Sequence, residues 1–199
     1  MSGVSAILLA AGSGSRFGGG KLTTILYGKP LITHPLEALR DVPLQEIVAV
    51  VGANAERLSE VCEPYGVRIV DNPDWEEGQS TSVRAGLQAM SPDARAAVVL
   101  LGDQPLVTAG AVSKLVEAFE SGAEVAVATY EGKRRNPVLF ARSVWPSLIG
   151  ELSGDEGARS FLQKHPNIVM EVPCDGVASP ADVDTRKDLR RIEGMRGLA

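Results

Sequence analysis

Short apolar runs alternate with helical patterns along most of the chain. Strands are predicted where aliphatic and β-branched residues follow one another without polar alternation, as in IVAVV and VVLL, because parallel strands covered on both faces need apolar side chains on each. The predicted strands are Ala6–Ala10, Ile47–Val51, Arg68–Val70, Ala97–Leu101 and Val125–Thr129. The predicted helices between them are Leu31–Leu39, Ala55–Cys62, Thr81–Met90 and Ala111–Glu120.

This alternation predicts the α/β class. We expect a mostly parallel sheet with right-handed crossovers, covered by helices on both faces in three layers, α/β/α. The second half is less regular, and its predicted elements are a strand at Pro137–Phe140, a helix at Ala158–Lys164, a strand at Ile168–Val172 and a closing helix at Thr185–Gly194. No repeat, low-complexity tract or linker interrupts the pattern, so we expect residues 1–199 to form a single domain.

The composition is that of an ordinary globular chain. Of the 199 residues, 44% are hydrophobic and only 5% aromatic, so the core is expected to be mainly aliphatic. A formal net charge of −5 argues against nucleic acid or an anionic membrane as the main partner. Cys62 and Cys174 lack the spacing of a disulfide framework or a metal site. The initial apolar run is too short for a membrane span. We therefore expect a reduced, soluble, cytoplasmic protein.

A glycine-rich loop follows the first predicted strand, in the sequence LLAAGSGSRFGGGK. Glycines let the backbone turn and bring its amides close to an anion, and Arg16 and Lys21 add two cations suited to phosphate oxygens. The dinucleotide fingerprint G-x-G-x-x-G fails because position 17 is Phe, and the P-loop pattern fails because Leu22 follows Lys21. We interpret the loop as a phosphate site of another kind.

Two acidic loops are candidates for metal binding. The segment VVLLGDQP presents Asp103 just after a predicted strand. A carboxylate that faces a phosphate loop there is suited to Mg²⁺, which takes one or two carboxylates together with substrate phosphates. The second loop, Asp182-Val183-Asp184-Thr185, precedes the last predicted helix. Asp184 or Thr185 is also suited to cap that helix, and an N-cap carboxylate can hold a metal as well.

Other polar loops are candidates for reading a base or an acceptor. Gly78–Ser82 leads into a predicted helix and offers hydroxyls and an amide to a nucleobase edge or an anion, although N-capping alone also accounts for it. Gly154–Arg159 is suited to a flap on the acceptor side. His34 and His165 show no pattern of catalytic partners. The absence of a Ser-His-Asp or Cys-His pattern fits nucleotidyl transfer, because a phosphate monoester is already largely ionised near neutral pH and needs no general base.

Together these segments resemble the MobA-like nucleotidyltransferases, and most closely the molybdenum-cofactor cytidylyltransferase (MocA-type) branch. Six motifs over nearly the whole chain carry the resemblance: LLAAGSGSRFGGGK at Leu8–Lys21, GQSTSV at Gly78–Val83, LGDQP at Leu101–Pro105, NPVLF at Asn136–Phe140, GDEGAR at Gly154–Arg159 and DVDT at Asp182–Thr185. This chain departs from the family pattern where Arg186 follows DVDT in place of Pro. The resemblance implies a Rossmann-like fold of the nucleotide-diphospho-sugar transferase type, with the nucleotide over the carboxyl ends of the strands.

The resemblance also implies roles for individual residues. Arg16, Lys21 and Asp103 are expected to be catalytic, and Asp103 and Asp184 to bind Mg²⁺. The residues expected to bind the nucleotide are Ala11, Gly12, Gly14, Ser80 and Ser82. Ala-Ala-Gly at positions 10–12 is typical of family members that use CTP, whereas guanylyltransferases more often carry Ala-Gly-Gly. Gln104 also suits the cytidylyl branch.

The function expected from this resemblance is transfer of CMP from CTP to the phosphate of a molybdopterin-type cofactor, with release of pyrophosphate. Three alternatives stay open. The acceptor is instead methylerythritol phosphate, a sugar phosphate or another cofactor precursor; the nucleotide is GTP; or the protein is a non-catalytic cofactor-binding chaperone for a molybdoenzyme client. Both acidic residues, Asp103 and Asp184, favour catalysis, because binding alone would not need a pair of metal ligands.

Overall fold

A seven-stranded sheet forms the centre of the structure, a computed structural model that describes residues 3–195. Its strands are β1 (Val4–Ala10), β4 (Ile47–Val51), β5 (Arg68–Asp71), β6 (Ala96–Leu101), β7 (Val125–Tyr130), β8 (Lys133–Ala141) and β9 (Val169–Pro173). The order across the sheet is β5-β4-β1-β6-β8-β7-β9. The strands β5, β4, β1 and β6 pair in parallel, as do β7 and β9, whereas β8 runs antiparallel to β6 and β7. The expected mostly parallel sheet is confirmed.

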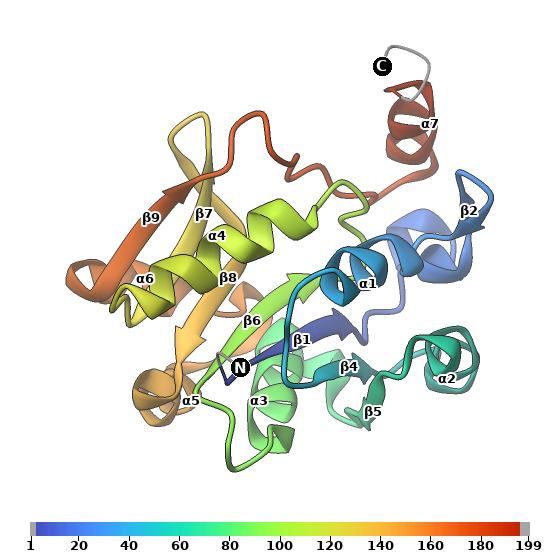
Figure 1. Cartoon of the computed structure of the whole chain (residues 1–199). Coiled ribbons are helices and arrows are strands. Elements are labelled where there is room, and N and C mark those ends of the chain that lie inside the picture. The colour runs from blue at the N-terminus through green and yellow to red at the C-terminus, as the bar shows by residue number, and fades with distance from the viewer. Residues whose placement is uncertain (1–2, 196–199) are drawn as a thin grey trace.

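Helices cover both faces of the sheet (Figure 1). Apolar side chains from α1 (Thr33–Arg40), α2 (Ala55–Cys62), α4 (Ala109–Glu120) and α7 (Arg186–Met195) join one core cluster. Those from α3 (Gln79–Ala89), α5 (Trp145–Glu151) and α6 (Arg159–Lys164) join the other. A small hairpin, β2 (Ile25–Leu26) and β3 (Lys29–Pro30), follows the glycine-rich loop. The arrangement is the expected three-layer, Rossmann-like one.

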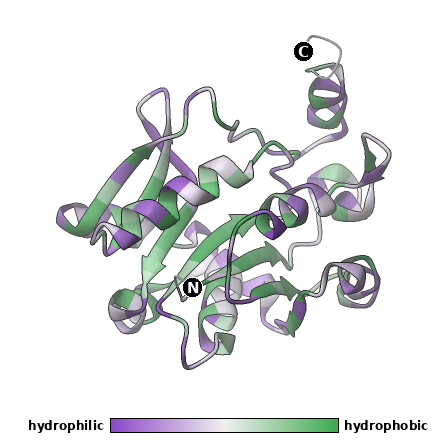
Figure 2. Cartoon of the chain, viewed as in Figure 1, coloured by the Kyte–Doolittle hydropathy of each residue, from purple (hydrophilic) through white to green (hydrophobic). Residues whose placement is uncertain are grey.

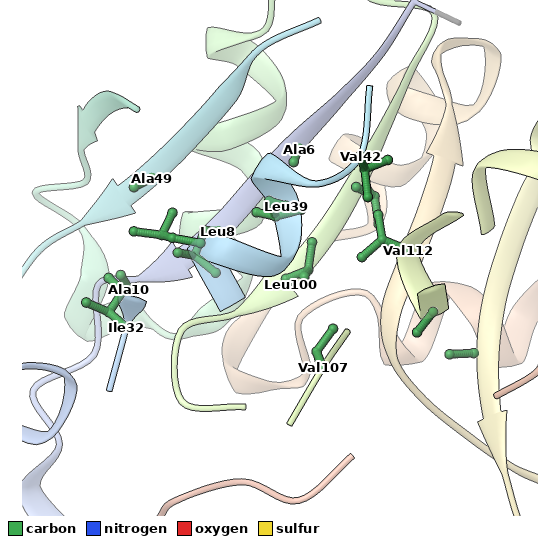
Figure 3. Close-up of a cluster of buried hydrophobic side chains, with 14 of the residues drawn as sticks. Ala6, Leu8, Ala10, Ile32, Leu39, Val42, Ala49, Leu100, Val107 and Val112 are labelled. Carbon is green, nitrogen blue, oxygen red and sulfur yellow. The ribbon is translucent and has the colours of Figure 1, made fainter. Parts of the chain in front are cut away.

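The two core clusters lie on opposite faces of the sheet because side chains alternate along each strand. In β1, Ala6 and Leu8 point to the cluster under α1, and Ile7 and Leu9 to the cluster over α3. Figure 3 shows part of the first cluster, where Leu39 of α1 gathers with side chains of the sheet. Figure 2 shows the central strands as hydrophobic and the helices as mixed in hydropathy, as expected for elements buried on two faces or on one.

The predicted elements are found within a few residues of their expected bounds, but the short hairpin β2–β3 was not predicted, and the second half of the chain differs in two places. The strand expected at Pro137–Phe140 is longer, because the polar residues Lys133–Arg135 pair with the end of β7 across a shift in register. The helix α5 was not predicted, since its seven residues are too few for a clear helical period. The closing helix starts as expected: Thr185 donates to Asp188 and accepts from its backbone N–H, which is a reciprocal cap.

Across residues 3–195, no helix is both long and apolar enough to cross a membrane.

Candidate active site

The carboxyl edge of the sheet holds a cavity of about 730 Å³. From β1 the chain proceeds to β4 and β5 on one side, and then returns to β6 on the other side of β1. The loops after β1 and β6 therefore diverge, which is where open α/β sheets bind ligands. Residues 9–16 and 21–22 line the cavity with Leu101 and Asp103, together with parts of the segments 75–82, 155–159 and 182–184.

The loop after β1 turns back on itself through glycines. Gly14 has φ 66°, and an added Cβ there would lie 2.9 Å from Cβ of Lys21, so glycine lets the two ends of the loop meet. Gly18, Gly19 and Gly20 also have positive φ. Gly12 differs, because an added Cβ would meet no atom within 4 Å, and Gly12 lines the cavity. Its missing side chain leaves room for a ligand to approach the backbone.

Four predicted residues from distant parts of the sequence meet in this cavity as ion pairs. Nζ of Lys21 lies 2.5 Å from Oδ2 of Asp103 and 3.7 Å from Oδ1 of Asp184. The guanidinium of Arg16 donates to Oδ2 of Asp184 at 3.0 Å. The Lys21 and Asp103 side chains are 15% and 19% exposed, whereas that of Arg16 is 75% exposed. The inner pair is therefore shielded from water, and its attraction is stronger than that of the outer pair.

The two acidic loops are joined through the backbone. The N–H of Val183 donates to the carbonyl of Asp103 at 3.0 Å, and the side chain of Gln104 donates to the carbonyl of Pro180 at 3.2 Å. These bonds hold Asp182 and Asp184 next to Asp103. Burial, followed by the nearby charges of Asp103 and Asp184, raises the pKa of Asp182. Sequence reasoning noted Asp182 only as part of its loop and not as a site residue.

The donor set fits a hard divalent cation that also binds phosphate. Oδ1 of Asp103 is buried and has no hydrogen-bond partner in the described chain, so this carboxylate has an oxygen left for a further ligand. Within residues 3–195, no group of three or more His, Cys, Asp or Glu side chains is arranged to hold a metal by itself. Substrate phosphates would have to supply the remaining ligands, as is usual for Mg²⁺.

The start of α3 forms the opposite wall, held by a buried asparagine. The Asn72 side chain is 3% exposed and donates to the hydroxyls of Thr81 and Ser82, both at 2.9 Å. Ser82 lines the cavity, as predicted for a nucleotide contact. Ser80 is placed differently: it is buried, is not among the lining residues, and donates to the carbonyl of Gly157 at 3.5 Å. Sequence reasoning did not single out Asn72, although its place directly after β5 was a usable signal.

A short segment that includes Gly154–Glu156 closes the cavity over the start of α3. Gly78 has φ 113°, and an added Cβ would lie 2.5 Å from the carbonyl carbon of Gly154. Asp155 and Arg159 line the cavity from this segment. The side chain of Arg159 makes no hydrogen bond or ion pair within residues 3–195, unlike those of Arg16 and Lys21. It is therefore a cation that is not already neutralised by a carboxylate.

The histidines and cysteines of the described chain are not among the residues that line this cavity. His165 binds Glu151 at 2.7 Å, and Nε2 of His34 is 2.9 Å from the carbonyl oxygen of Leu26. Both cysteines are buried and free, and burial raises the pKa of the Cys62 thiol to about 11. A neutral, buried thiol is a poor nucleophile. What gathers in the cavity is a set of phosphate-binding and metal-binding groups.

Known structures and proteins resemble the chain over its full length. A structure of the Rv0371c homologue from Mycobacterium sp. strain JC1 is 32% identical, covers 100% of this chain and 99% of its own, and superposes with a TM-score of 0.87. Rv0371c of Mycobacterium tuberculosis, solved in complex with manganese, is 26% identical, covers 96% of this chain and 98% of its own, and has a TM-score of 0.82.

Curated relatives carry different activities. Nicotine blue oxidoreductase of Paenarthrobacter nicotinovorans is 33% identical over 95% of this chain and 96% of its own length. Molybdenum cofactor guanylyltransferase of Rhizobium meliloti is 29% identical over 94% of this chain and 89% of its own. The bifunctional protein GlmU of Maricaulis maris is 36% identical over 70% of this chain, but the match spans only 31% of GlmU.

One domain model covers most of the chain. The model described as the MobA-like NTP transferase domain matches residues 6–169, from β1 to the start of β9. That range contains the glycine-rich loop, Asp103 and the start of α3, and leaves out only Asp184 among the four paired residues. The chain belongs to the MobA-like NTP transferase family.

Proposed function

We propose that the protein transfers CMP from CTP to the phosphate of a molybdopterin-type cofactor and releases pyrophosphate. The observation that carries this proposal is the meeting of Lys21 and Arg16 with Asp103 and Asp184 in one cavity at the carboxyl edge of the sheet. Cations for a triphosphate and carboxylates for its metal are the two requirements of nucleotidyl transfer.

The reaction requires positioning and charge stabilisation rather than a proton acceptor. An oxygen of the acceptor phosphate attacks the α-phosphorus, a new P–O bond forms, and the bond to the β-phosphate breaks so that pyrophosphate leaves. Lys21, shielded by its surroundings, and Arg16 stabilise the negative charge that develops on the leaving oxygens. Gly12 and Gly14 allow the backbone of the loop to approach the phosphates.

A divalent cation fits the acidic side of the cavity, and we propose Mg²⁺, held by Asp103 and Asp184. Support comes from the unpartnered, buried oxygen of Asp103 and from the manganese complex of the related Rv0371c. When bound, such an ion neutralises phosphate charge and orients the triphosphate. The relief of repulsion among the three clustered carboxylates, including Asp182, also favours a cation there.

The choice of CTP rests on Ala-Ala-Gly at positions 10–12, where Ala11 and Gly12 line the cavity beside Ser82. The acceptor phosphate is assigned to the side of Arg159, because that cation has no carboxylate partner within the described range. The related guanylyltransferase supports a molybdenum-cofactor acceptor and keeps GTP as the alternative nucleotide. Methylerythritol phosphate and sugar phosphates use the same chemistry, and a cofactor chaperone for a molybdoenzyme would bind without turnover.

An oxidoreductase is a second candidate, since the curated relative of that name is 33% identical over 95% of the chain. The glycine-rich loop does not favour it, because the loop lacks the dinucleotide fingerprint. Oxidation of NADH or NADPH with a redox acceptor, in the absence of any nucleoside triphosphate, is the activity that would support this candidate over the transferase.

The test is pyrophosphate release in the presence of Mg²⁺ and the molybdopterin-type cofactor, with CTP and GTP in parallel. Release with CTP alone is the expected result. Release with GTP alone would overturn the nucleotide assignment and keep the transferase. Release with neither, from protein that is shown to be folded, would contradict the proposed reaction. The same assay with methylerythritol phosphate would then identify a different acceptor.

A further inference from the structure

Trp75 is an aromatic residue of the cavity that the proposed reaction does not use. It starts the short helical turn Trp75–Glu77, is half-buried, and lines the cavity. The position of an added Cβ on Gly52 would be 2.8 Å from Cβ and Cγ of Trp75 and also 2.8 Å from the carbonyl oxygen of Ala11. The tryptophan therefore packs on Gly52, directly beside the backbone of the Ala-Ala-Gly segment.

The turn that carries Trp75 is fixed in place by buried polar groups. The side-chain oxygen of Asn72 accepts from the backbone N–H of Asp74 at 3.1 Å. The backbone N–H of Asn72 donates to the carbonyl of Val51 at 2.8 Å. The hydroxyl of Thr81 donates to the carbonyl of Asp74 at 3.0 Å. These bonds tie the turn to β4 on one side and to α3 on the other. An aromatic side chain that is already held in place loses little conformational entropy when a ligand binds, so more of the contact free energy appears as affinity.

The cavity is chemically divided along its length. The ion pairs of Lys21 and Arg16 lie on the side of the glycine-rich loop and the acidic loops. Trp75 lies beside Ala11 and lines the cavity together with the uncharged residues Gly78 and Ser82, and the charged residues Glu76, Asp155 and Arg159 also line it outside the ion pairs. A ligand that pairs with Lys21 and Arg16 and also contacts the indole has several negative charges at one end and a flat group with polar edges at the other. A nucleoside triphosphate has this form.

We infer that Trp75 is the aromatic wall against which the nucleobase lies. This inference rests on the proposed nucleotide-binding function and adds a specificity residue to it. Stacking on an aromatic ring is available to every base, because each has a π-face. Trp75 therefore sets the preference for a nucleotide over a bare polyphosphate, and the edge of the base is read by the neighbouring backbone and Ser82.

The test compares two ligands that differ by the nucleoside. Binding of CTP and of inorganic triphosphate, each with Mg²⁺, is measured by calorimetry for the wild type, Trp75→Phe and Trp75→Leu. Stacking of one base on an aromatic ring corresponds to about 1–3 kcal/mol, or roughly 5- to 150-fold in affinity. We expect Trp75→Leu to weaken CTP binding by that factor and triphosphate binding by less than about twofold. Trp75→Phe should retain most of the CTP affinity.

Tryptophan fluorescence supplies a second readout that does not depend on the leucine variant folding. The chain has two tryptophans, and Trp145 lies in the core, where its indole donates to the carbonyl of Phe140 at 3.1 Å. CTP should quench the wild type, inorganic triphosphate should not, and Trp75→Phe, which keeps only Trp145, should show no change with either ligand.

The outcomes separate this inference from the proposed function. The role of Trp75 would be overturned, and the transferase kept, if folded Trp75→Leu bound CTP as tightly as the wild type. The same conclusion would follow if bound CTP left the fluorescence of the wild type unchanged. Wild-type protein that binds no nucleoside triphosphate at all would overturn both. Equal loss of CTP and triphosphate binding in Trp75→Leu would also contradict the role, because it would indicate damage to the phosphate site.

Discussion

At the scale of single residues, Asp103 connects the cationic and the acidic groups of the cavity. It pairs with Lys21 through one carboxylate oxygen, and its other oxygen is buried without a partner in the described chain. We predict that Asp103→Asn and Asp103→Ala keep the fold and lower turnover by about 10²- to 10³-fold, the usual effect of removing one element of electrostatic stabilisation. Pyrophosphate release measures turnover, and Mn²⁺ paramagnetic resonance measures metal binding.

Asp93→Asn, an exposed change between α3 and β6, is the control. Near-wild-type turnover in the Asp103 variants would contradict the metal role.

Gln104 belongs to the LGDQP motif, and in the structure its side chain links the loop after β6 to the loop before α7. The residue suits the cytidylyl branch, yet its side chain is buried and donates to the carbonyl of Pro180. We predict that Gln104→Leu, which removes this bond, weakens Mn²⁺ binding several-fold and leaves the ratio of CTP to GTP use unchanged. The free energy of unfolding should fall by about 0.5–1.5 kcal/mol, because the half-buried carbonyl of Pro180 loses its donor. A changed nucleotide ratio with intact metal binding would show that Gln104 reads the base.

The residues that could be predicted from the sequence are the charged ones next to strand ends. Arg16, Lys21, Asp103 and Asp184 each stand in a loop with a recognisable motif, and the structure brings all four together. Trp75 could not be predicted, because its contribution depends on packing against Gly52, whereas Asn72 has a usable signal in its place directly after β5. The motif does not separate Ser80 from Ser82, but the structure does: the hydroxyl of Ser80 is turned toward Gly157.

At the scale of elements, the contact between the start of α3 and the segment Gly154–Arg159 shapes one wall of the cavity. Gly78→Ala would place a methyl group 2.5 Å from the backbone of Gly154, and backbone there has no flexible end that can move aside. We predict a loss of about 1–3 kcal/mol in the free energy of unfolding and a raised KM for the acceptor, since Arg159 belongs to the displaced segment.

The control for this prediction is Gly66→Ala. Gly66 lies in the left-handed region with ψ 29°, and an added Cβ would meet nothing within 4 Å, whereas Gly78 has ψ 173°, which with its positive φ is a conformation for glycine alone. Chemical denaturation therefore compares a left-handed glycine in open space with a strained glycine in contact. If Gly66→Ala is as destabilised as Gly78→Ala, neither the conformation nor the contact of Gly78 adds a measurable cost.

The order of elements could be predicted because the inner strands of the parallel half are largely apolar on both faces. The strands β4 and β6 are continuous aliphatic runs, β1 is interrupted only by Ser5, and their helices repeat apolar residues on one side. The first half of β8 does not follow from the hydrophobic pattern, since Lys133–Arg135 are polar and pair with β7. The local signal for this strand is its turn instead: Glu131 and Gly132 both have positive φ and join β7 to β8 as a two-residue hairpin.

The whole molecule should become more stable when the cavity is filled. The lining residues come from segments as far apart in sequence as Leu9 and Asp184, so a ligand that contacts both resists their separation. At 100 times the dissociation constant, bound ligand stabilises the fold by about 2.7 kcal/mol, which corresponds to a rise in Tm of roughly 5–11 °C for a chain of this size. Differential scanning fluorimetry with CTP and Mg²⁺ measures this rise. Lys21→Met should abolish it, and an equal rise in that variant would place the ligand elsewhere.

The ion pairs between Lys21, Arg16 and the two aspartates have a consequence for competition in the cell. Each cation already faces a counter-ion, so a stray sulfate or phosphate has to separate oppositely charged groups before it can enter. If a nucleotide entered together with a divalent metal, Asp103 and Asp184 would hold the ion while Lys21 and Arg16 would pair with the phosphates, so that these four charges would all keep partners. On the proposed function, we expect Lys21 and Arg16 to discriminate against inorganic anions that come without a metal.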